Sequence, residues 1–170
     1  MNAKHPPPTS AEEIGRRVLD WVVGIHGPED LSRDRLETAI GLSMIDAPDD
    51  PRQYGIGERI DERWHYSLHS LPDDGGRRRM LFSFDDSTGA FDDLSAICAL
   101  DYDAYAAALT AAGYAQAPDL GPREAFNGMI FTRDGVRVRM QLLSESAARP
   151  GHLCVSALLI DAAGGGHAQV

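Results

Sequence analysis

Residues 129–142 constrain the fold more than any other stretch of this sequence, because they predict a β-hairpin of fixed register. The central pair, Asp134 and Gly135, suits a two-residue turn that needs positive φ at both positions. Counting outward from this turn places Phe131 opposite Val138. One face then carries the apolar side chains of Met129, Phe131, Val136, Val138, Met140 and Leu142. Since side chains alternate along a strand, the other face carries Thr132, Arg137, Arg139 and Gln141.

Three segments have the spacing of amphipathic helices. The first begins at Ser10, which with Glu13 forms a capping-box pair, and apolar residues then recur at three- and four-residue steps to about residue 27. A second helix is expected to begin at Ser32 and to end before Pro48. The third is expected between Asp101, as its N-cap, and Gly113.

Further strands are expected at 62–71 and 79–84, where apolar and polar residues alternate. The stretch 153–160 is apolar on both faces, so we expect it to be an inner strand. The segments 46–57 and 117–122 are rich in Pro and Gly and are expected to be loops.

These elements predict an α+β protein with one mostly antiparallel sheet of about five strands and helices packed on one face. We expect a single domain over residues 10–161, preceded by a disordered arm at 1–9 and followed by a flexible tail at 162–170. The sequence shows no internal repeat.

The charge balance restricts the classes of partner. Against 26 Asp and Glu the chain has 16 Lys and Arg, a formal net charge of −10. Long-range repulsion therefore disfavours nucleic acid and anionic membranes, and favours a partner with a basic surface. No apolar run approaches the roughly 20 residues of a membrane span, and the first residues lack the apolar core of a secretory signal. We therefore expect a cytoplasmic protein of undetermined oligomeric state.

The two cysteines, Cys98 and Cys154, both lie in apolar runs. We expect them to be buried, reduced thiols that act as small hydrophobic side chains. A disulfide or a reactive thiol remains open as an alternative.

The sequence offers weak candidates for metal binding. His65 and His69 have the H-x3-H spacing of a helical zinc site, but they lie in a predicted strand. At about 3.3 Å per residue their rings would stand roughly 13 Å apart, too far to share an ion. Gly55 and Gly57 are better explained by a turn than by a phosphate loop. The run 77–79, three arginines, is interpreted as a solvated edge that deters strand pairing rather than a phosphate grip.

Candidates for nucleophilic catalysis are equally weak. Ser43 lacks the second glycine of a nucleophile elbow and lies in a predicted helix. A pair formed by one cysteine with His65, His69 or His152 would require the two to meet in space, which no local pattern indicates. We therefore expect a protein without catalytic residues, metal or cofactor.

The most informative feature is an acidic segment. Residues 80–122 contain no Lys or Arg. A solvated loop that also supplies negative charge to a helix N-terminus would explain the pattern. The alternative that we adopt is a contact surface for a basic protein, because a field of one sign raises association rates and partner selectivity. The predicted contact residues are Asp85, Asp86, Asp92, Asp93, Asp101 and Asp103.

The stretch from residue 98 to residue 160 resembles the C-terminal half of small bacterial immunity proteins, which neutralise toxins of type VI and related contact-dependent delivery systems. The resemblance rests on the residue runs 98–105, 109–114, 131–138 and 153–155. It covers little more than a third of the chain and carries over no functional residue. It implies a role in which a small acidic protein binds one cognate toxin and occludes its active site.

A fainter resemblance links the chain to the acidic α+β chaperones of type III secretion, which bind unfolded effector segments. The predicted C-terminal strand and glycine-rich tail depart from the C-terminal helix of those chaperones. A small hydrolase-type enzyme is the alternative from a different class.

Overall fold

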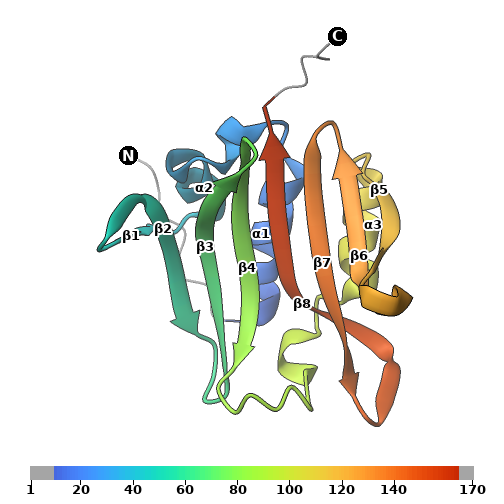
Figure 1. Ribbon diagram of the computed structural model, residues 1–170. Helices are drawn as coiled ribbons and strands as arrows, with labels where there is room; N and C mark the ends of the chain where they lie inside the picture. The colour runs from blue at the N-terminus through green and yellow to red at the C-terminus, as the bar shows by residue number, and fades with distance from the viewer. Residues whose placement is uncertain (1–9, 165–170) are drawn as a thin grey trace.

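An antiparallel sheet of eight strands, in the order β1-β2-β3-β4-β8-β7-β6-β5, forms the frame of the molecule (Figure 1). The computed structural model describes residues 10–164, so the expected arm at 1–9 and most of the expected tail lie outside the described residues. The strands are β1 (Ile45–Ala47), β2 (Asp50–Arg59), β3 (Trp64–Asp74), β4 (Arg77–Asp86), β5 (Ala115–Leu120), β6 (Phe126–Arg133), β7 (Val136–Ser146) and β8 (Arg149–Ala163).

The expected sheet of about five strands is wrong, because three strands lie in or next to segments that we expected to be loops. β1 and β2 occupy most of 46–57, and β5 covers 115–120. Their prolines do not interrupt inner ladders. Pro51 precedes Gly55, where pairing of β2 with β3 begins, and Pro118 lies on the edge strand β5.

The hairpin register is confirmed. Phe131 pairs with Val138 and Met129 with Met140. The turn residues Asp134 and Gly135 have φ of 48° and 85°, as the two-residue turn requires. The predicted inner strand is also confirmed, since β8 pairs with β4 on one side and β7 on the other.

Three α-helices and two short 3-10 helices, η1 and η2, belong to the layer that covers one face of the sheet (Figure 1). The predicted N-caps are confirmed, since Ser10, Ser32 and Asp101 accept backbone N–H groups. The first helix ends earlier than expected, at Val23. The helices are α1 (Ala11–Val23), α2 (Arg33–Ile40), α3 (Tyr102–Ala111), η1 (Pro28–Leu31), η2 (Ser95–Ile97) and a third 3-10 turn, η3 (Pro122–Glu124).

The core lies between this layer and the sheet. It is built from large buried side chains of both layers, among them Ile14, Leu36, Trp64, Tyr66, Phe82, Tyr105, Phe131 and Ile160. No helix within residues 10–164 is long and apolar enough to cross a membrane.

Arg133, at the end of β6, fixes two helix ends to the sheet. Its guanidinium donates hydrogen bonds to the carbonyls of Ala112, Val23 and Ile25, at 2.7, 3.0 and 2.6 Å. It also lies 4.4 Å from the ring centroid of Tyr114. Carbonyls beyond a helix end have no partner in the helix, so this one cation satisfies groups next to both α1 and α3.

The chain order divides the fold into two halves that the sequence does not reveal as a repeat. Helices α1 and α2 precede the meander β1 to β4, and α3 precedes the meander β5 to β8. The last strands of the two meanders, β4 and β8, pair at the centre of the sheet.

Candidate functional site

The acidic segment lies at the end of the sheet where β4 finishes, on the loop that leads to α3 (Figure 1). Asp85 is on the sheet face opposite the helices, next to His65 of β3, with 3.8 Å between carboxylate and imidazole. Asp92, Asp93 and Asp103 are exposed. These four aspartates are the part of the predicted contact set that faces solvent.

Asp86 holds the loop together and is not available to a partner. Its carboxylate side chain is fully buried and accepts two hydrogen bonds from the guanidinium of Arg63, at 3.0 and 2.7 Å. It also accepts the hydroxyl and backbone N–H of Thr88 and the backbone N–H of Phe91, at 2.7 to 2.9 Å. Arg63, followed by the Thr88 and Phe91 donors, holds the pKa of this carboxyl well below its usual range.

Arg63 also changes the electrostatic interpretation of the segment. It lies between β2 and β3, and its guanidinium contacts both Asp86 and Asp92. The acidic segment has no basic residue of its own, but the fold places the guanidinium of Arg63 against it. The field of the loop is weaker than the sequence predicts, and it is concentrated on Asp85, Asp93 and Asp103.

The loop presents an aromatic residue that sequence reasoning missed. Phe91 is 39% exposed and has a left-handed backbone, with φ of 48°. Its ring contacts Trp64 edge-on, with 5.8 Å between centroids. A non-glycine residue at positive φ costs free energy that the surrounding hydrogen bonds must offset. An aromatic residue between Gly89 and two aspartates was the available signal in the sequence.

A cluster around His152 brings together residues that the sequence leaves far apart. Cys98 precedes α3, Cys154 and His152 lie on β8, and Glu145 lies near the end of β7. Nδ1 of His152 is 3.6 Å from the Cys98 sulfur and 3.6 Å from a Glu145 oxygen. Its Nε2 is 2.8 Å from a carboxylate oxygen of Asp101. Asp101 raises the pKa of the His152 imidazole.

The two cysteines form a disulfide, with 5.0 Å between their α-carbons. Their expected burial is confirmed, since Cys98 is 4% and Cys154 0% exposed, but the expectation of free thiols is wrong. An antiparallel backbone pairing of Asp101 with Cys154 places the start of α3 beside β8. This pairing brings the two cysteines within bonding distance. Disulfides persist mainly in oxidising compartments, whereas we expected a cytoplasmic location. The cytoplasmic location stays a prediction.

The contact between a cysteine and a histidine that the sequence left open is present, with His152 as the partner of Cys98, but the Cys98 sulfur belongs to a disulfide and is not a thiol. His65 and His69 instead lie on β3, away from this cluster. Within residues 10–164, the group of three metal-type ligands is Cys98, His152 and Cys154.

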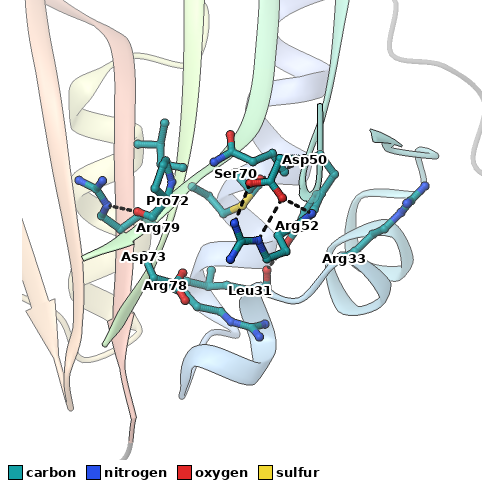
Figure 2. A pocket seen from close by; sticks show the side chains of 13 residues that line it. Leu31, Arg33, Asp50, Arg52, Ser70, Pro72, Asp73, Arg78 and Arg79 are labelled. Atoms are coloured by element: carbon teal, nitrogen blue, oxygen red, sulfur yellow. Dashed lines mark hydrogen bonds and ion pairs between the residues drawn. The ribbon is translucent and has the colours of Figure 1, made fainter. Parts of the chain in front are cut away.

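At the opposite end of β3 and β4, a cavity of about 690 Å³ is lined by four arginines, Arg33, Arg52, Arg78 and Arg79 (Figure 2). Three of them have intramolecular acceptors: Arg33 contacts Glu37 and Asp46, Arg52 contacts Asp50, and Arg79 donates to the Pro72 carbonyl. The cavity is therefore only weakly prepared for an anion.

The interpretation of 77–79 as a solvated edge is wrong. These residues pair with β8 in the centre of the sheet. The Arg77 side chain contacts Asp161, a carboxylate 2% exposed that also accepts from Arg137. A buried carboxylate requires such cations.

No protein-family model, no curated protein and no solved structure matches this chain.

Proposed function

We propose that the protein is a non-catalytic binding protein of the immunity type, which binds a cognate bacterial toxin with a basic surface and occludes it. The observation that carries this proposal is the β4–α3 loop, in which an exposed Phe91 stands among solvent-facing aspartates. Binding interfaces typically combine a central aromatic anchor with a charged rim.

The loop is preorganised for such a role. Asp86 fixes the backbone at Thr88 and Phe91, and Arg63 fixes Asp86. A loop that is already ordered loses less entropy on binding than a flexible one, so more of its contact free energy contributes to affinity.

The exposed carboxylates define the chemistry of the partner. Asp85, Asp93 and Asp103 would attract lysine or arginine side chains around the Phe91 contact. The chain's net charge of −10 acts in the same direction at long range.

The competing function is catalysis by Cys98, His152 and Asp101. The His152 ring contacts the Cys98 sulfur through Nδ1 and the Asp101 carboxylate through Nε2, as in a cysteine–histidine–carboxylate triad. Cys98 is 4% exposed and bonded to Cys154, so a substrate has no approach to its sulfur. The geometry therefore favours binding over catalysis.

The test is co-expression with the product of the gene next to its own, which the proposal requires to be a toxin. We expect the wild-type chain to restore growth and to bind the purified toxin in a calorimetric titration. Phe91→Ala should weaken the affinity by about 30-fold or more, the effect of an interface hot spot. The matched control is Phe126→Ala, since Phe126 is 54% exposed but lies on β6. Equal effects of the two substitutions would place the interface elsewhere, and absence of both rescue and binding would refute the function.

A further inference from the structure

The cluster around His152 has the donor set of a zinc site, with a disulfide in place of two thiolates. Zinc prefers cysteine sulfur, histidine nitrogen and carboxylate oxygen in tetrahedral geometry. Cys98, Cys154 and His152 supply three such atoms, and Glu145, whose carboxylate pairs with Arg149 at 2.9 Å, lies beside His152. The two sulfurs and the imidazole nitrogen already lie within 4.8 Å of one another.

The distances around Nδ1 of His152 match a tetrahedral site. Zn–S bonds of about 2.3 Å and Zn–N or Zn–O bonds of about 2.0 to 2.1 Å place sulfur about 3.6 Å from nitrogen, and nitrogen about 3.4 Å from oxygen. In this structure Nδ1 is 3.6 Å from the Cys98 sulfur and 3.6 Å from the Glu145 oxygen. Two edges of the tetrahedron are therefore already formed.

The hydrogen-bond partner of the other ring nitrogen of His152 is also typical of a histidine that binds a metal. Its Nε2 is 2.8 Å from Asp101, a carboxylate that can only accept when it is ionised. Nε2 therefore carries a proton, and in the neutral ring the lone pair is on Nδ1, facing Cys98 and Glu145. A carboxylate behind a histidine ligand fixes the ring and its tautomer in many zinc sites.

We propose that reduction of the Cys98–Cys154 bond converts this cluster into a zinc site, with Cys98, Cys154 and His152 as ligands and Asp101 as a positioning residue. Glu145 becomes the fourth ligand by turning from Arg149 toward the sulfurs. A dithiol reductant supplies two electrons and two protons, the S–S bond breaks into two thiols, and the reductant becomes a disulfide. Zn²⁺ then displaces the two thiol protons to water. The sulfurs must separate to about 3.8 Å, the S–S edge of the tetrahedron.

The consequence is a cross-link in both redox states. Either the disulfide or the metal connects the loop before α3 to β8, and so keeps the start of α3 in place. Thiol–disulfide exchange with a disulfide oxidant would reverse the conversion, re-forming the S–S bond and releasing Zn²⁺.

The test is a titration of the full chain with Co²⁺ and Zn²⁺, with and without a phosphine reductant. We expect the reduced chain to bind one Co²⁺ with the thiolate charge-transfer and ligand-field bands of a tetrahedral site, and Zn²⁺ to displace it. The oxidised chain should bind none. His152→Ala should abolish the bands, while Asp101→Asn should weaken zinc affinity by about 10- to 100-fold. Asparagine is as good an N-cap as aspartate, so this variant keeps α3 intact.

His69→Ala is the matched control, because His69 lies on β3 outside the cluster, and it should leave the titration unchanged. Far-ultraviolet circular dichroism reports the fold of each sample. A reduced chain that stays folded and gives no thiolate–Co²⁺ bands would overturn the proposal. If the reduced chain unfolds without metal, Zn²⁺ must restore its spectrum, and failure to do so overturns the proposal as well.

Discussion

Arg63 and Asp86 form a two-pronged ion pair, with Nε and Nη2 at 3.0 and 2.7 Å from the two carboxylate oxygens. Asp86 ends β4 and pairs in register with Trp64, so the ion pair joins the loops on both sides of the β3–β4 hairpin. The bidentate geometry places this pair among the stronger protein hydrogen bonds, and it sets the shape of the loop that presents Phe91.

This ion pair predicts how stability responds to acid. The pKa of Asp86 is lowered in the folded protein. A lowered pKa contributes stability that is present above the unfolded value of about 3.9 and is lost as pH falls below it. We therefore expect Asp86→Asn to lower the urea midpoint at pH about 7, and the gap to the wild type to narrow toward pH about 2. Asp103→Asn, at an exposed position, should leave the midpoint unchanged at both values. A gap that widens in acid would contradict the assigned role.

The hairpin predicts a contrast between its two faces. Phe131 is 0% exposed, so Phe131→Ala should cost about 3 to 5 kcal/mol in the free energy of unfolding. Arg137→Ala should cost less than about 1 kcal/mol, because Arg77 remains as a partner for Asp161. Denaturant melts measure both values. Equal losses would show that the faces are assigned wrongly.

We expect a substitution at Gly135 to change stability through backbone conformation alone. Its φ is 85°, and an added Cβ would lie no closer than 3.8 Å to its nearest neighbour outside the adjoining residues, the Ala163 carbonyl oxygen. Gly135→Val should therefore destabilise by about 1 to 3 kcal/mol without a steric clash, because a β-branched residue is strained at positive φ. Thermal melts test this, with Gly151→Val as the control, since an added Cβ there has open space and ordinary φ. A Val variant at 135 as stable as the wild type would reject the turn geometry.

The acidic loop predicts a salt-dependent association rate with the proposed toxin partner. Wild-type association should slow as salt shortens the screening length from about 30 Å at 0.01 M to about 10 Å at 0.1 M. Replacing Asp85, Asp93 and Asp103 with Lys should slow association most at low salt and leave the pair of Arg63 with Asp86 in place. A control with the same charge change carries Lys at Asp20, Asp73 and Asp74, outside the loop. Stopped-flow rates that are indifferent to salt and to both variants would place the interface on the open sheet face around Arg137 and Arg139.

The elements that the sequence predicted correctly are those whose pattern is local. The hairpin register follows from its own turn, and the three helix starts follow from their caps. Strand β2 was not predicted, because its Gly55 is required by the close approach of β3. A Cβ at Gly55 would lie 2.6 Å from the Cβ of His69 on β3. Glycine in this position permits close strand approach, whereas in the sequence it resembles loop composition.

The candidate sites were harder to predict, because charge and chemistry are shared between distant segments. The sequence identified the acidic loop but not Arg63, which reaches it from the turn between β2 and β3. Asp86 and Asp101 have structural roles that a count of aspartates does not reveal. Cys98 and His152 are 54 residues apart in the chain, and the backbone pairing of Asp101 with Cys154, which places the start of α3 beside β8, brings them together.

The pairing of β4 with β8 has a consequence for the kinetics of folding. Within each half every strand pairs with the next along the chain, so loop closure is short and each meander can form early. Met80 and Ile160, by contrast, pair although nearly half of the chain's length separates them in the sequence. Because such distant contacts raise the contact order, joining the two meanders should be the slow step, and a partly folded chain would present β4 and β8 as two unpaired hydrophobic edges. The strands most prone to pair with another chain are thus hidden in the finished protein, at the middle of its sheet.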